Sequence, residues 1–164
     1  MNFYTGIGSR SAPANILGLM HKIAVRLLDL NFTLRSGGAS GSDSAFESGA
    51  GTDKQIFLAK HSTPAAMAIA AEHHPAWDRC SEYARKLHAR NVFQILGSDL
   101  SSPSKFVICW TPDGCYNHAT RSIRTGGTGT AISIAANYGV PVFNLAIRSH
   151  LDRLERFANK NTHK

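Results

Sequence analysis

Three glycine-rich turns follow apolar segments in this sequence, and each is followed by a helical pattern. They are Gly6-Ile7-Gly8-Ser9, Ser36-Gly37-Gly38-Ala39-Ser40-Gly41 and Gly126-Gly127-Thr128-Gly129-Thr130. Glycine lets backbone N–H groups approach a ligand closely, and the start of a helix adds unpaired donors and a favourable dipole. The hydroxyls of Ser9, Ser36, Thr128 and Thr130 add further donors. This combination suits a bound phosphate.

Each turn also has an ordinary structural explanation. A single glycine turn between a strand and a helix more often only reverses the chain than holds a phosphate. Three such turns in one short chain favour the phosphate interpretation, and the turn at 126–130 is the most specific because it is unusually rich in glycine. No Gly-Lys-Ser/Thr follows it, so it is not a Walker motif, and it lacks the GxGxxG spacing of dinucleotide-binding proteins.

The segments between the turns alternate between strand and helix patterns. Pro13 opens a segment with helical apolar spacing as far as Leu28, whereas the run Phe106–Trp110 is typical of a strand in mid-sheet, covered on both faces. Residues 60–75 fit neither pattern clearly. The expected strands are 3–7, 32–34, 55–59, 106–110 and 140–145, and the expected helices are 13–28, 42–50, 77–94, the segment from the third turn to about 138, and 149–159.

Strands and helices that alternate in this way form a parallel sheet with right-handed crossovers. A chain of 164 residues and 17.7 kDa fits one domain. The sequence therefore predicts the α/β class, with a single Rossmann-like three-layer domain over residues 1–164 and a mostly parallel sheet of about five or more strands. In such a sheet the three turns lie at the same carboxyl edge and converge on one crevice, where ligands of these folds bind.

The net charge of +7 is unevenly distributed. Residues 1–82 carry seven basic and seven acidic side chains, whereas residues 83–164 carry eleven and four. This bias favours an anionic partner, either a nucleotide or a nucleic acid, although a solvated basic surface explains the charge equally well.

Several other classes of protein do not fit the sequence. No apolar run approaches the roughly 20 residues that span a bilayer, and the first residues lack the pattern of a secretory signal, so we expect a cytoplasmic protein without a membrane partner. The odd number of cysteines (Cys80, Cys109 and Cys115) argues against a disulfide framework. His61, His73 and His74 lack a partner at helical spacing, and we expect neither a metal site nor a cofactor.

The second turn and its surroundings resemble a known superfamily. The segment Ser36–Asp43, followed by Ala45, resembles the SGGARGID-like signature of the DprA recombination mediator. Arg90-Asn91, the apolar strand at 106–110, the turn Thr125–Thr130 and Pro141-Val142-Phe143 are similar to the rest of that family's Rossmann-like domain. The third turn is also similar to the PGGxGTxxE motif of the LOG-type phosphoribohydrolases. Both families belong to the SLOG superfamily.

The resemblance implies a nucleotide-derived ligand in the crevice and a homo-oligomer, but it does not carry over the hydrolase activity. The LOG motif has a glutamate three residues after its Gly-Thr pair, and Ser133 stands at that position here; its leading proline is replaced by Thr125. The DprA likeness also suggests single-stranded DNA, which would need a positive groove with aromatic platforms. The residues available for such a groove are Arg85, Lys86, Arg90, Arg121, Arg124, Trp110 and Tyr116.

Two carboxylates are close to the expected crevice. Asp43 matches the acid of the DprA-like signature and could bind a ribose hydroxyl or act as a base, but it could equally cap the following helix. Glu47 stands at capping-box spacing from Ser44 and is more simply structural. Asp43 is thus a weak candidate for catalysis.

These considerations lead to one main expectation and two alternatives. The protein is expected to bind a nucleotide or a nucleotide-derived signal molecule, as a sensor or a sequestering protein. It could instead be a nucleotide N-glycosidase, similar to a phosphoribohydrolase, or a transferase; the third possibility is DprA-like binding of single-stranded DNA. The candidate ligand-binding residues are Gly6, Gly8, Ser9, Arg10, Ser36, Gly37, Gly38, Asp43, Arg90, Asn91, Trp110, Gly126, Gly127, Thr128, Gly129 and Thr130.

Overall fold

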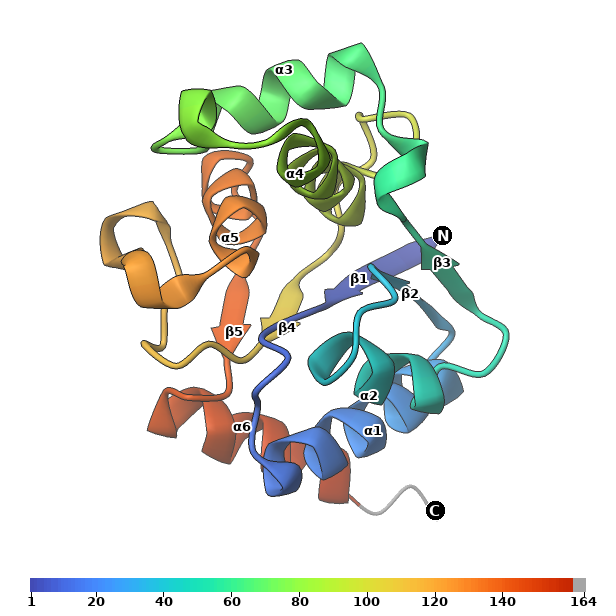
Figure 1. Cartoon of the computed structure of the whole chain (residues 1–164). Helices are drawn as coiled ribbons and strands as arrows, with labels where there is room; N and C mark the ends of the chain where they lie inside the picture. The colour runs from blue at the N-terminus through green and yellow to red at the C-terminus, as the bar shows by residue number, and fades with distance from the viewer. Residues whose placement is uncertain (161–164) are drawn as a thin grey trace.

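The computed structural model describes residues 1–160 and shows a three-layer α/β domain (Figure 1). All five strands are parallel, in the order β3-β2-β1-β4-β5. This is the predicted fold class. The strands are β1 (Asn2–Gly6), β2 (Phe32–Ser36), β3 (Lys54–Ile56), β4 (Val107–Cys109) and β5 (Val142–Asn144).

Three helices cover each face of the sheet (Figure 1). One face carries α1 (Ala14–Asp29), α2 (Ser42–Gly49) and α6 (Arg148–Asn159); the other carries α3 (Pro64–Glu72), α4 (Glu82–Leu96) and α5 (Thr128–Asn137). Short 3-10 helices lie in the connections: η1 (Ala59–His61), η2 (Trp77–Arg79), η3 (His118–Thr120) and η4 (Ile123–Thr125).

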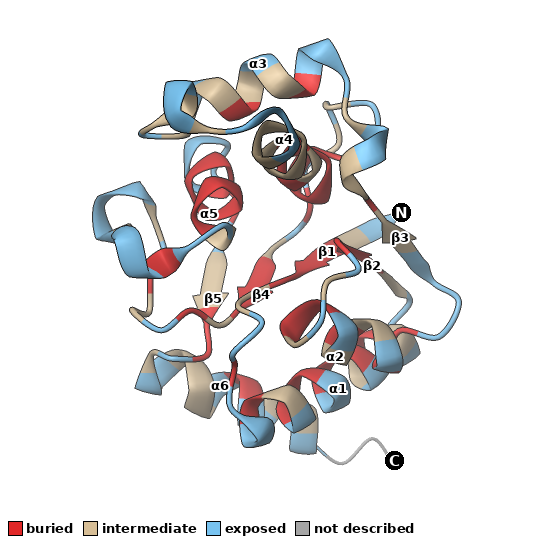
Figure 2. Cartoon of the chain, in the orientation of Figure 1, coloured by how far each residue is buried: buried red, intermediate tan, exposed pale blue. Residues whose placement is uncertain are grey.

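The core consists of two apolar clusters, one on each face of the sheet. One cluster joins α3, α4 and α5 to the sheet, and the other joins α1, α2 and α6 to it. β1 lies at the centre and β4 beside it, so the strand expected in mid-sheet is internal but not central. Figure 2 shows buried residues concentrated on these two strands and on the helix faces that turn toward them.

Two expected elements differ from the structure. The strand expected at 55–59 is β3, which ends at Ile56. The helix expected to begin at Trp77 is α4, which begins at Glu82: the Ser81 side chain accepts a hydrogen bond from the Ala84 N–H at 3.1 Å and caps the helix there. Residues 60–75, which had no clear pattern, contain the whole of α3, whose small apolar side chains give little amphipathic contrast.

No helix between residues 1 and 160 is both long and apolar enough to cross a membrane.

Candidate functional site

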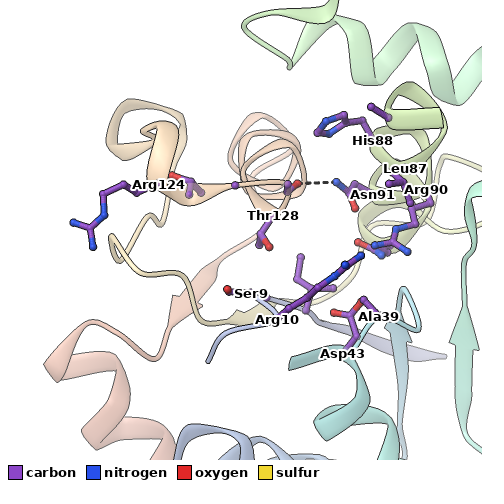
Figure 3. Close-up of a pocket in the computed structure, with 17 residues that line it drawn as sticks. Ser9, Arg10, Ala39, Asp43, Leu87, His88, Arg90, Asn91, Arg124 and Thr128 are labelled. Carbon is purple, nitrogen blue, oxygen red and sulfur yellow. Dashed lines mark hydrogen bonds between the residues drawn. The ribbon is translucent and has the colours of Figure 1, made fainter. Parts of the chain in front are cut away.

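A cleft of about 420 Å³ opens at the carboxyl edge of the sheet (Figure 3). It lies between the turns that follow β1 and β2, the inner side of α4 and the start of α5. Its volume is within the usual range for small-molecule sites. The lining residues are Ile7, Gly8, Ser9, Arg10, Ala39, Asp43, Ala84, Leu87, His88, Arg90, Asn91, Gln94, Arg124, Thr125, Gly126, Gly127 and Thr128.

The first turn depends on Gly8. Its φ of +152° is rarely adopted by residues with a side chain, and an added Cβ would lie only 2.8 Å from the Trp110 carbonyl oxygen. The Ser9 N–H donates to that carbonyl at 3.0 Å, and the Ser42 hydroxyl donates to the Ser9 carbonyl at 2.7 Å. The turn is therefore held between the end of β4 and the start of α2, with Arg10 at the edge of the cleft.

The second turn places a buried carboxyl group in the cleft. Asp43 is 3% exposed, and its Oδ2 accepts a hydrogen bond from the Ala39 N–H at 3.2 Å. Burial raises the pKa of this carboxyl to about 6, although the Ala39 N–H and the Arg90 guanidinium both favour its charged form. Asp43 is the only carboxylate among the residues described around the cleft.

Polar side chains from α4 approach Gly37 closely. The Arg90 Nη1 donates to the Gly37 carbonyl at 2.9 Å, and a Cβ at Gly37 would lie 2.5 Å from the Gln94 Nε2 and 2.9 Å from the Asp43 Oδ2. A side chain at Gly37 would therefore displace these polar groups from the turn. Two buried atoms of this group, the Arg90 Nε and the Gln94 Oε1, have no hydrogen-bond partner within residues 1–160.

A hydrogen bond links the third turn, which immediately precedes α5, to α4. The Asn91 Nδ2 donates to the Gly127 carbonyl at 3.0 Å, as the dashed line in Figure 3 shows. A Cβ added at Gly126 or Gly127 would meet no atom within 4 Å, so both glycines border open space. Gly127 has φ −62° and ψ −25°, which any residue adopts, and the first turn of α5 follows it with Thr128 at the cleft.

Positive charge dominates the cleft. Arg10, Arg90 and Arg124 line it, and none of them forms a salt bridge in the part of the chain that the structure describes. The Arg10 side chain reaches toward Arg90, whereas that of Arg124 extends away from them (Figure 3). Burial lowers the pKa of Arg90, Asp43 raises it, and the nearby charge of Arg10 lowers it further. Arg10 and Arg90 therefore repel each other, and an anion bound between them would offset this repulsion.

The structure gathers nine of the sixteen candidate ligand-binding residues around the cleft. They are Gly8, Ser9, Arg10, Asp43, Arg90, Asn91, Gly126, Gly127 and Thr128.

The other seven candidates do not line the cleft, because most of them pack against neighbouring elements and support the turns. The Ser36 hydroxyl donates to the Gly6 carbonyl at 2.6 Å, and a Cβ at Gly6 would collide with Phe46. Gly129 packs against Arg121, and Trp110 contacts the core next to α1, α2 and α6. The remaining three are Gly37 and Gly38, which shape the second turn, and Thr130, which is fully buried.

Eight lining residues are not among the sixteen candidate ligand-binding residues, although Arg124 was named for a DNA-binding groove. They are Ile7, Ala39, Ala84, Leu87, His88, Gln94, Arg124 and Thr125. Four of them follow one another along α4 with Arg90 and Asn91, at helical spacing. Because Arg90 was a candidate, helical spacing of three or four residues from it could have predicted further lining residues on the same helix.

The expected capping box at Ser44 and Glu47 is absent. The N-cap of α2 is Gly41, and Glu47 instead forms a 2.9 Å ion pair with Lys54 outside the cleft. Ser133, which stands where the LOG motif has a glutamate, is 2% exposed; its Oγ lies 2.8 Å from the His118 Nδ1 and accepts from the Arg121 Nη1 at 3.2 Å. Neither position supplies a carboxylate to the cleft.

Fold and site together define a Rossmann-like α/β domain with a cationic cleft at the carboxyl edge of its sheet. Comparison of the chain with protein-family models, with curated proteins and with solved structures found no match.

Proposed function

We propose that the protein binds a nucleotide or a nucleotide-derived signal molecule in this cleft, as a sensor or a sequestering protein of the SLOG superfamily. The observation that carries the proposal is the meeting of Arg10 and Arg90 across the cleft without a salt bridge to either within residues 1–160. Two guanidinium groups that line one cleft and repel each other favour an anion between them, and phosphate accepts the paired N–H donors that arginine offers.

The cleft divides into parts that match the parts of a nucleotide. The start of α5, with Gly126, Gly127 and Thr128, offers backbone N–H groups and a positive helix end beside the arginines. Ile7, Ala84 and Leu87 provide apolar surface for a base. The unpartnered Gln94 Oε1 and the Asp43 carboxyl are suited to hydroxyl or amine donors of a sugar or base.

A substitution at Gly127 tests the proposal directly. Because a Cβ at this position meets open space and the backbone is helical, both Gly127→Asp and Gly127→Ala are expected to fold. Only the aspartate adds a negative charge at the proposed phosphate position. Repulsion between charges about 4 Å apart is worth about 1 to 4 kcal/mol, so we expect roughly tenfold or greater loss of affinity in Gly127→Asp.

The measurement is isothermal titration calorimetry with a panel of linear and cyclic nucleotides. A native mass spectrum of the freshly purified protein first identifies any retained ligand and guides the choice of panel. Gly127→Ala serves as the matched control, and circular dichroism checks the fold of both variants. Equal affinity of the folded aspartate variant and the wild type would remove this turn from the site, and the absence of binding by any nucleotide would refute the proposal.

A second candidate function rests on the raised pKa of Asp43. A carboxyl with a pKa of about 6 can accept and donate a proton near neutral pH, which suits general acid–base catalysis of N-glycosidic bond cleavage or transfer. Under this alternative, chromatography after incubation with nucleoside monophosphates shows free base. The release falls by about 10²- to 10⁴-fold in Asp43→Asn. Wild-type protein without measurable release leaves binding as the function.

A further inference from the structure

A second group of reactive side chains lies next to the cleft and includes His88, which also lines it. His74 follows the end of α3, Cys80 lies just before α4, and His88 lies on α4. These three residues offer one ligand atom each, and the three atoms lie within 4.8 Å of one another. All three side chains are partly buried. The sequence did not predict this arrangement, because separations of six and eight residues match no helical pair of metal ligands.

We propose that His74, Cys80 and His88 bind one zinc ion or a similar borderline-soft divalent cation. A thiolate and two imidazoles are ligands that Zn²⁺ prefers, and tetrahedral coordination separates sulfur and nitrogen by about 3.6 Å. The Cys80 Sγ lies 3.6 Å from the His74 Nε2. The rings of His74 and His88 are 4.3 Å apart between centroids, so a small side-chain rotation closes the set. A water or another small ligand would complete the four positions.

His88 is oriented and kept neutral for this role. Its Nδ1 lies 2.9 Å from the Thr130 Oγ1, which also accepts a hydrogen bond from the Arg121 Nη2 at 3.0 Å. In the tautomer with its proton on Nδ1, His88 donates to this hydroxyl and leaves the Nε2 lone pair for a metal. Burial is the main influence that lowers the pKa of His88 to about 4, and the neighbouring His74, Arg121 and Arg90 lower it further.

His74 has to change one hydrogen bond. Its Nδ1 accepts from the Ala76 N–H at 3.0 Å, which places the proton of the neutral ring on Nε2. Coordination through Nε2 requires the other neutral tautomer, in which the proton has moved to Nδ1, so the ring can no longer accept the Ala76 N–H bond. One hydrogen bond contributes far less than a metal–thiolate bond, so the exchange favours the metal.

Arg121 is the main opposing influence. Burial and the charge of Arg121 lower the pKa of His74, which keeps this ring neutral, but the same charge repels a metal ion. The Cys80 thiolate offsets one of the two charges of the metal, since the proton of the thiol is released on binding. A bound ion would link the segment between α3 and α4 to α4. Other residues of α4 line the cleft.

The proposal is tested by titrating Co²⁺ into untagged protein that has been stripped with a chelator. We expect one equivalent to produce the near-ultraviolet charge-transfer band of a thiolate-bound cobalt ion, and Zn²⁺ to abolish the band by displacement. Zn²⁺ is also expected to raise the unfolding temperature. Both effects should be lost in Cys80→Ser and in His74→Gln, and kept in the matched control His73→Gln, whose Nδ1 bonds the Ile69 carbonyl outside the cluster.

Three results would overturn the proposal. They are the absence of the band in the wild type, its persistence in Cys80→Ser, and its equal loss in His73→Gln. The wild-type titration decides the matter by itself if a variant fails to fold. Because nucleotide binding is measured separately by calorimetry, failure of the metal site leaves the proposed function unaffected.

Discussion

At the scale of single residues, the Asp43 carboxyl lines the cleft and also affects the stability of the fold. It is almost fully buried, and the backbone N–H of Ala39 only partly replaces the water that its charged form loses. Its pKa of about 6 is well above the value of about 3.9 expected in the unfolded chain. Ionisation of Asp43 therefore weakens the folded state, which is a common cost at a binding site.

The pH dependence of stability follows from this difference. Below about pH 4 Asp43 is protonated in both states, and its ionisation costs nothing; the cost appears as the pH rises from about 4 to 6 and is complete above that range. We expect Asp43→Asn to be more stable than the wild type by about 1 to 3 kcal/mol at pH 7, and the gain to vanish near pH 4. Urea unfolding at several pH values measures it, with Asp53→Asn as the control, because Asp53 is exposed and forms no salt bridge within residues 1–160. A gain independent of pH would contradict this account.

At the scale of elements, the start of α4 decides which of its residues reach the cleft. Ser81 caps the helix, and Arg90, Asn91 and Gln94 follow about two and a half to three and a half turns later on the side that faces the glycine turns. The Ser81 hydroxyl is needed only if the helix begins there. A helix that began at Trp77 would have Ser81 in its interior, where serine is less favourable than alanine.

Whether Ser81→Ala lowers or raises the stability distinguishes a helix that begins at Glu82 from one that begins at Trp77. We expect a loss of about 1 kcal/mol in the free energy of unfolding because the Ala84 N–H loses its partner. Ser81→Asp should retain most of the stability, since aspartate is also a good cap. Urea unfolding measures all three proteins. A gain in stability in Ser81→Ala would mean that the helix extends back beyond Ser81.

At the scale of the whole molecule, the question is whether the basic charge serves a small ligand or a nucleic-acid strand. Arg10, Arg90 and Arg124 lie in a bounded cleft, and other basic side chains are distributed over the surface, as on α6. A bounded cleft holds one or a few phosphates, whereas binding along a strand recruits many.

We therefore expect affinity for single-stranded oligonucleotides to change little with length beyond a few nucleotides. The logarithm of the affinity should fall with the logarithm of salt concentration with a slope of only about 1 to 2, because few phosphates are contacted. Fluorescence anisotropy with a series of labelled oligonucleotides tests this, and Arg156→Ala on α6 is a control away from the cleft. Affinity that grows steadily with length and has a steep salt slope would support DNA binding instead.

The sequence by itself determined the fold class and the approximate position of the cleft. Alternation of apolar runs, glycine turns and helical spacing is a local signal, and a parallel sheet then brings the turns to one edge by topology alone. For this reason Ser9, Asp43 and Gly127 could be predicted at one cleft before any coordinates were known.

Only the tertiary structure decided which side of each turn faces the cleft and which residues far apart in sequence lie in contact. Ser36 and Gly129 turn toward Gly6 and Arg121, whereas Gln94 and His88 enter from α4 because of how that helix packs. The cluster of His74, Cys80 and His88 likewise forms where the connection between α3 and α4 folds back on α4. Such contacts depend on packing between elements, which local spacing does not encode.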